Sequence, residues 1–218
     1  MSIVTQITEH PRKPGRYVVD VDGGEFAIVN AETLAETRTR VGVVVDEPLA
    51  ARLRDAADDV AMYDRALNLL AFRARSAREL HRRLTMKGES RDRAERVISR
   101  LRDIGLVDDA DFARQLVRSK VSSGASRRRV QQELFRKGVS RDVADEAVAE
   151  VLEDEQVDEV AVAERVARKR LPSLASADAA TQRRRLYAFL ARRGHDSDTI
   201  RTVMDRVLSD DPDVAADD

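Results

Sequence analysis

From about residue 60 onward, hydrophobic side chains recur at intervals of three and four residues, the spacing that lines one face of an α-helix. Ala94, Val97, Ile98 and Leu101 give one example of such an apolar stripe. The pattern predicts nine helices, at 59–74, 76–87, 90–104, 109–123, 126–137, 140–154, 159–171, 179–193 and 196–209. The chain is therefore predicted to be mainly α-helical.

The helical pattern is itself repeated. SARELHRRLTMKG (76–88) aligns with SRRRVQQELFRKG (126–138) at a shift of 50 residues, and RRRLYAFLARRG (183–194) follows at a further shift of 56. Each copy ends on a glycine, which is typical of a helix C-cap. Three tandem three-helix repeats account for this pattern. Because one such unit makes a poor core by itself, we expect neighbouring units to pack together in an elongated curved stack.

The first 60 residues differ. RYVVDVDGGEFAIV (16–29) alternates apolar and polar positions around Asp22-Gly23-Gly24, which predicts a β-hairpin. VGVVVD (41–46) is a candidate short strand, and Pro48 suits a helix start. The expected domains are an N-terminal β-hairpin and helix region at 1–57, repeats at 58–107, 108–157 and 158–209, and a disordered acidic tail at 210–218.

Acidic pairs also recur with the repeat. Asp108-Asp109, shifted by 50 residues in either direction, falls on Asp58-Asp59 and on Asp158-Glu159, and each pair precedes an apolar helical pattern. Clustered carboxylates suit a metal ion or acid–base chemistry, but they also accept hydrogen bonds from the free N–H groups of a first helical turn. A catalytic cluster is expected to occur once in a chain, whereas a helix start is expected in every repeat. We therefore predict N-caps, with Asp109 capping the helix at 109–123.

Composition narrows the class of protein. Charged residues make up 36% of the chain and aromatic residues 4%, which favours helices with an Ala/Leu/Val core. No cysteine occurs, so neither a disulfide nor a thiolate metal site is expected, and a reducing compartment is favoured. We also find no signal-peptide pattern and no apolar run near the roughly 20 residues that span a bilayer. We expect a cytoplasmic protein with no membrane partner.

Catalytic motifs are not apparent. His10, His81 and His195 lie far apart without metal-ligand spacing, and we expect all three at the surface. The sequence has no GxxxxGK[ST] phosphate loop, no GxGxxG after a strand and no HExxH. We therefore predict a protein that is not an enzyme, with no catalytic residue, metal site or cofactor.

Charge is distributed unevenly along the chain. Residues 1–60 carry 7 basic and 11 acidic side chains, residues 61–151 carry 21 and 14, and residues 152–218 carry 11 and 15. The basic middle suits an anionic partner. Residues seven apart on a helix lie within about 20° of each other, so Arg129 and Arg136 share one exposed face, as do Arg185 and Arg192.

These side chains form a candidate partner-binding set, here called the arginine ladder. It comprises Arg78, Arg82, Arg128, Arg129, Arg136, Lys137, Arg184, Arg185 and Arg192. A phosphate backbone or an acidic protein surface would suit it. The alternative is a solvated helical surface whose charges pair locally.

The chain resembles the RecX regulatory proteins, modulators of the RecA recombinase. The resemblance spans about Arg16 to Leu208 and rests on VDGGEFAI, ALNLLAFRARSARELHRRLTMKG, IGLVDDADFARQLVRSK and SRRRVQQELFRKGVS. It implies three tandem three-helix repeats. It also implies a protein, expected to be a monomer, that binds the RecA–single-stranded DNA filament and inhibits its ATPase, extension and strand exchange in the control of DNA repair and recombination. The alternatives are a helical-repeat nucleic-acid-binding protein and a scaffold for a different partner.

Overall fold

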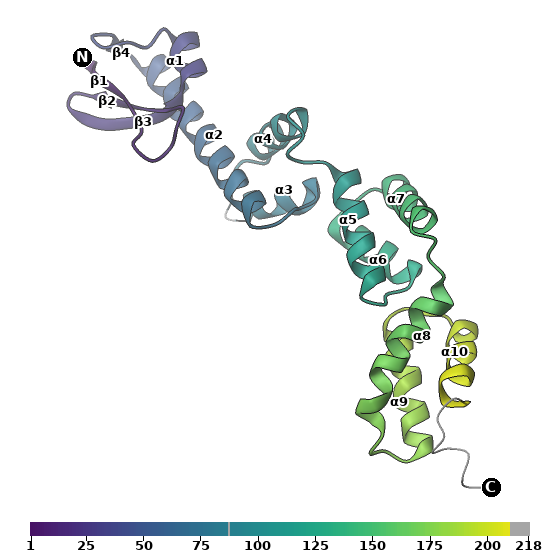
Figure 1. Cartoon of the computed structure of the whole chain (residues 1–218). Helices are drawn as coiled ribbons and strands as arrows, with labels where there is room; N and C mark the ends of the chain where they lie inside the picture. The colour runs from purple at the N-terminus through teal and green to yellow at the C-terminus, as the bar shows by residue number, and fades with distance from the viewer. Residues whose placement is uncertain (87, 210–218) are drawn as a thin grey trace. The chain divides into compact units, whose positions relative to one another are not determined.

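The structure, a computed structural model, describes residues 1–86 and 88–209, where it shows ten α-helices and a small sheet (Figure 1). It divides into two compact units. The first contains Met1–Ala74 and Leu80–Leu106, and the second contains Arg75–Glu79 and the chain from Val107 onward. The predicted mainly helical class is confirmed. The predicted disordered tail at 210–218 lies outside the described residues.

An antiparallel sheet occupies the N-terminal part of the first unit. Its strands are β1 (Ser2–Glu9), β2 (Arg16–Val21), β3 (Gly24–Asn30) and β4 (Val44–Val45), in the order β3-β2-β1-β4. The predicted hairpin is confirmed as β2 and β3, which are joined by Asp22 and Gly23 at positive φ. The segment VGVVVD supplies β4. Strand β1 was not predicted, because its side chains are mostly polar and only Val4 is fully buried.

Helix α2 (Glu47–Phe72) is the longest element of the first unit. Asp46 caps it by accepting the Leu49 N–H at 2.9 Å, and Pro48 lies in its first turn, as the sequence predicted. The helix then runs through the position where the sequence predicted a new start at 59. Asp58 and Asp59 therefore do not cap a helix, and that prediction is wrong.

The two carboxylates instead join α2 to α4 (Arg91–Asp103). The Arg93 guanidinium lies 2.7 Å from Asp59 and 3.3 Å from Asp58, and Arg96 lies 3.0 Å from Asp59. An acidic pair before an apolar pattern resembles a helix start, but here the helix is already running. Helix α2 also covers the sheet, since Leu53 packs with Val4, Val19, Ala27 and Val29.

The other eight predicted helices match helices of the structure to within two residues at each end, whereas α1 was not predicted. The remaining helix of the first three-helix repeat is α3 (Ala77–Thr85), whose first turn belongs to the second unit. The second repeat contains α5 (Asp109–Ser122), α6 (Arg127–Lys137) and α7 (Arg141–Asp154). The third contains α8 (Glu159–Arg170), α9 (Ala179–Arg192) and α10 (Ser197–Ser209). Outside the repeats lies α1 (Ala31–Thr37), and a 3₁₀ turn, η1 (Leu171–Leu174), follows α8.

Small and branched apolar side chains form the two cores of the second unit. In the second repeat the buried set includes Phe112, Val117, Leu134, Val148 and Val151. In the third it includes Val166, Leu174, Leu186, Leu190 and Val203. Most of these positions belong to the stripes that the three- and four-residue spacing indicated.

Two joints between repeats are built from helix ends. At the first, the Ser76 hydroxyl donates to the Lys137 carbonyl at the end of α6 and accepts the Glu79 N–H at 3.1 Å, so it serves the C-terminus of one helix and the N-terminus of another. At the second, the Ser126 N–H donates to the Arg193 carbonyl after α9 at 3.0 Å, while its hydroxyl accepts the Arg129 N–H at 3.3 Å. Groups that a helix leaves without partners are thus paired across each joint.

Acidic side chains complete the same two joints. Asp108 and Asp158 cap their own helices, α5 and α8, by accepting first-turn N–H groups. Bonds from the N–H groups of Asp111 and Ala110 lower the pKa of Asp108. Asp109 instead accepts the Ala77 N–H of α3 at 2.8 Å, and Glu159 accepts the Arg127 N–H of α6 at 2.8 Å. The prediction that Asp109 caps its own helix is therefore wrong, although Asp109 does cap a helix.

Glycine allows the helix ends to approach. Gly138 has φ +84°, and a Cβ built on it would lie 2.2 Å from the Arg78 Cδ. Gly194 has φ +92°, and its Cβ would lie 2.7 Å from the Arg129 Cβ. Gly88, at the equivalent position of the first repeat, has φ +81° but no atom within 4 Å of the added Cβ. Among these three, only Gly138 and Gly194 are therefore required by space as well as by conformation.

We predict that Gly138→Ala lowers the melting temperature more than Gly88→Ala. Both changes place a Cβ in the left-handed region, at a cost of about 1–2 kcal/mol. Only the first also forces a side chain into the Arg78 stem. Thermal unfolding followed by circular dichroism measures the difference. Equal losses for the two variants would contradict the account of the joint.

Asp108→Ala and Asp109→Ala should each lower the free energy of unfolding by about 0.5–2 kcal/mol, the usual range for losing a cap. Their local effects should differ. Amide hydrogen exchange should accelerate at Ala110 and Asp111 in Asp108→Ala, and at Ala77 in Asp109→Ala. If exchange at Ala77 did not change in Asp109→Ala, the assignment of this cap would be incorrect.

Candidate partner-binding surface

The arginine ladder is almost entirely at the surface. Eight of its nine members are exposed, namely Arg78, Arg82, Arg128, Arg129, Arg136, Arg184, Arg185 and Arg192. Lys137 is half-buried, and its Nζ lies 3.5 Å from the buried Glu79 carboxylate. Lys137 therefore takes part in the first joint, and its charge is partly neutralised there.

The joints bring part of the ladder together within the second unit. The stem of Arg78 lies against Gly138, and Gly138 directly follows Arg136 and Lys137 at the end of α6. In the same way, the Cβ of Arg129 lies against Gly194, two residues after Arg192. Cations in the first turn of a helix thus lie beside the end of the corresponding helix in the next repeat, whose last turn also carries cations. Arg82 lies further along α3, in the first unit.

Most of the ladder is not neutralised by neighbouring carboxylates. Among the described residues, Arg128, Arg129, Arg184, Arg185 and Arg192 have no ion pair. Arg136 comes no closer than 3.8 Å to Glu133. Arg93, by contrast, lies within 3.3 Å of the carboxylates of Asp55, Asp58 and Asp59. Local charge pairing thus applies to Arg136, whereas the other five arginines are solvent-exposed and have no ion pair within the described part of the chain.

A second group of cations serves the joint between α5 and the third repeat. Arg165 donates to the carbonyls of Ser122 and Val121 at 3.0 and 3.3 Å, and Arg193 donates to the Ser123 carbonyl. These carbonyls lie at the C-terminal end of α5, where the last carbonyls of a helix lack partners within the helix; the Val121 carbonyl also accepts the Gly124 N–H at 2.9 Å. The Arg193 guanidinium also lies 4.6 Å from the centroid of the Phe189 ring. These two arginines are structural.

His195 is buried, so the prediction that it lies at the surface is wrong. Its side chain lies at the same joint, with Nε2 3.1 Å from the Gly124 carbonyl and Nδ1 without a hydrogen-bond partner among the described residues. Burial lowers its pKa, and Arg193 acts in the same direction, while the Gly124 carbonyl and the charges of Glu159 and Asp196 act against it. One signal could have indicated this burial, because the equivalent residue of the second repeat is the apolar Val139.

The other two histidines are not brought together with it. His81 is half-buried with its Nε2 3.9 Å from Glu95, and His10 accepts the Arg12 N–H. Within residues 1–86 and 88–209, no group of three or more His, Cys, Asp or Glu side chains is placed to hold a metal ion. No helix in those ranges is long and apolar enough to cross a membrane.

Three-helix units in tandem, joined through their helix ends and bearing exposed arginines, define a helical-repeat protein. Three family models match its units: the first three-helix domain of RecX at residues 63–101, the second at 108–148 and the third at 157–204. The chain belongs to the RecX family.

Curated relatives from several bacteria carry the name "Regulatory protein RecX". The protein of Levilactobacillus brevis is 33% identical over 124 residues, covering 57% of this chain and 46% of the relative. That of Mycobacteroides abscessus is 41% identical over 97 residues, covering 44% of this chain and 47% of the relative. The matched region thus spans about half the length of these curated relatives. Their name describes a regulatory protein family.

Solved structures support the fold. A crystal structure of regulatory protein RecX superposes with a TM-score of 0.70 at 20% identity, covering 96% of this chain and 100% of the other. The crystal structure of RecX from Lactobacillus salivarius gives a TM-score of 0.56 at 21% identity, covering 70% and 97%. At these identities the likeness concerns the fold alone.

We predict that His195 makes the protein less stable in mild acid. Its pKa is lowered in the folded state, whereas in the unfolded state it should lie near 6.5. The unfolded chain therefore binds the proton more tightly, and stability falls as the pH drops below about 6.5. In His195→Val, which copies the second repeat, the melting temperature should fall less between about pH 7.5 and 5.5, on either side of that value. A parallel fall in both proteins would contradict this.

Proposed function

We propose that this protein binds a RecA filament on single-stranded DNA and restrains it, inhibiting ATP hydrolysis, filament extension and strand exchange. Membership of a regulatory family supports a regulatory role. The RecA partner follows from the sequence resemblance. The part of the molecule that we assign to binding is the arginine ladder.

The observation that carries this assignment is the unneutralised charge at the two joints. Arg128 and Arg129 project from the first turn of α6 without ion pairs among the described residues, beside the last turn of α9 with Arg192. Guanidinium groups in water bind phosphate and carboxylate groups by paired N–H bonds. A filament of protein on DNA presents both, at regular intervals. Several weak contacts made by one chain add through avidity.

This mode of action requires no catalytic group in the protein itself. A regulator that binds an assembled filament changes the filament's ATP turnover by favouring one of its conformations. We therefore propose that the protein is not an enzyme and acts in the cytoplasm as a monomer.

The test is steady-state ATP turnover by RecA on single-stranded DNA. We expect micromolar wild-type protein to slow turnover, and Arg128→Ala/Arg129→Ala/Arg136→Ala to inhibit several-fold less. These exposed positions should each change stability by no more than about 0.5 kcal/mol, and alanine at position 129 keeps the Cβ that lies beside Gly194. Added salt should weaken the wild-type effect because it screens exposed charges.

A matched control is Arg12→Ala/Arg40→Ala/Arg91→Ala, which removes the same charge from exposed positions outside the ladder. It should inhibit as well as wild type. Wild-type protein without effect on turnover would overturn the proposed function. Equal inhibition by both triple variants would keep that function but remove these arginines as its carriers.

A further inference from the structure

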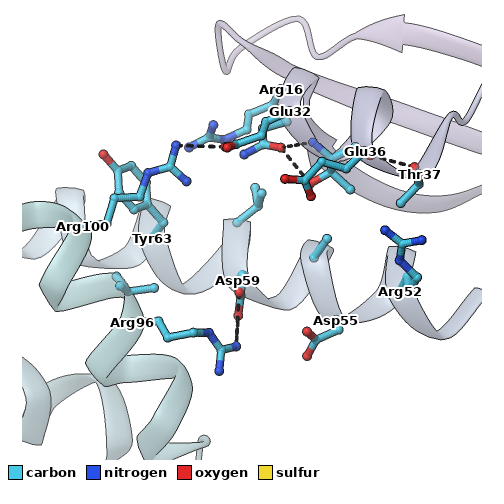
Figure 2. A pocket seen from close by; sticks show the side chains of 15 residues that line it. Arg16, Glu32, Glu36, Thr37, Arg52, Asp55, Asp59, Tyr63, Arg96 and Arg100 are labelled. Atoms are coloured by element: carbon cyan, nitrogen blue, oxygen red, sulfur yellow. Dashed lines mark hydrogen bonds and ion pairs between the residues drawn. The ribbon is translucent and has the colours of Figure 1, made fainter.

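A groove of about 530 Å³ lies within the first unit, between α1, α2 and α4 (Figure 2). Its floor is one face of α2, on which Arg52, Asp59 and Tyr63 recur at helical spacing. Its residues come from separate elements that lie far apart in the sequence. No motif of the sequence indicates it.

The two sides of the groove carry opposite charges. Glu32 and Glu36, four residues apart on α1, line one side, and Arg96 and Arg100, four residues apart on α4, line the other. At one end the sides are linked, since Arg100 lies 3.5 Å from Glu32. Both partners of that pair are more than half exposed, so the link contributes little to stability and opens readily.

The floor beside that link holds an aromatic anchor. Two guanidinium groups lie near the Tyr63 ring, with the Arg16 carbon 5.7 Å and the Arg100 carbon 5.5 Å from its centroid. Tyrosine and arginine are among the residue types that dominate protein–protein contacts. Two further lining charges are unused: among the described residues, neither Glu36 nor Arg52 has an ion pair, and both are exposed.

The lining favours one class of occupant. Four carboxylates, including Glu36, accompany four guanidinium groups, so a phosphate backbone would meet as much repulsion as attraction. Small-molecule sites are mostly apolar, and this groove is not. The arginines of the α4 side are already paired, Arg96 with Asp59 at 3.0 Å and Arg100 with Glu32, so the charges left open among the described lining residues are Glu36 on α1 and Arg52 on α2. A protein segment with a basic residue toward Glu36 and an acidic residue toward Arg52 would satisfy both.

We infer that this groove receives such a mixed-charge segment from the recombinase subunit, while the arginine ladder serves the anionic groups of the filament. The inference rests on the proposed function, and it separates a protein-directed contact in the first unit from a charge-directed contact that lies, apart from Arg82, in the second. Figure 2 shows Arg52 and Glu36 among the labelled residues that line the groove.

The experiment compares two charge reversals, Glu36→Lys and Arg52→Glu, with Arg91→Glu as a control at an exposed site outside the groove. Affinity is measured for RecA assembled on an oligo(dT) strand with a non-hydrolysable ATP analogue, and separately for the free oligo(dT) strand. We expect each groove variant to raise the filament Kd at least fivefold. Arg91→Glu should change it less than twofold, and circular dichroism should show that all variants are folded.

The direction in which each variant changes the affinity distinguishes a protein segment from nucleic acid as the occupant of the groove. If a protein segment of mixed charge occupies the groove, both reversals weaken binding to the filament, and neither changes binding to free oligo(dT). If the groove bound nucleic acid, Glu36→Lys would strengthen binding and Arg52→Glu would weaken it, both to the filament and to free oligo(dT). This result would overturn the inference. Filament binding equal to wild type in both variants would also overturn it and leave the proposed function standing. Wild-type protein that fails to bind the filament would remove the proposed function itself.

Discussion

The organisation of the second unit depends on pairing the ends of helices from successive repeats. The last carbonyls of a helix lack internal partners, and burying them unpaired would cost free energy. Here Ser76 and Ser126 satisfy the carbonyls of Lys137 and Arg193, while Asp109 and Glu159 satisfy the N–H groups of the adjoining first turns. Opposite partial charges of the two helix termini face each other, which adds favourable electrostatics. Each joint therefore requires a serine, a carboxylate and a glycine at fixed places in the repeat.

These joints also concentrate positive charge at the surface. Cations are favoured near helix C-termini, so arginines in the last turn of α6 and α9 stabilise the helices that carry them. The glycine that follows lets an arginine of the preceding repeat, Arg78 or Arg129, pack its stem or Cβ beside them. A structural preference thus produces a cluster that suits anions. Lys137 is an exception, because its ammonium group already pairs with the Glu79 carboxylate and is therefore less available to an anion.

The first unit handles charge differently. Many of its arginines are paired with carboxylates of neighbouring elements, as Arg93 is with three aspartates and Arg16 with Asp64. Such pairing removes net charge while leaving directional hydrogen-bonding groups at the surface, which favours selectivity over attraction. A groove with one acidic and one basic side is the outcome between α1 and α4. The two units therefore offer surfaces of different chemistry to a partner.

Local signals were enough to predict the helices, the three repeats and the β2–β3 hairpin, because apolar periodicity, terminal glycines and turn residues act within a few positions of the chain. They also indicated which ladder arginines are exposed, since these lie off the apolar stripe. Which helix each carboxylate caps depended instead on tertiary packing. Asp58 lies within a continuous α2, Asp109 caps α3 rather than α5, and His195 is buried where the preceding repeat has Val139. The groove was equally hidden, because it is formed by residues that separate elements bring together. Partners across a joint are set by packing between distant segments, and no local pattern records that packing.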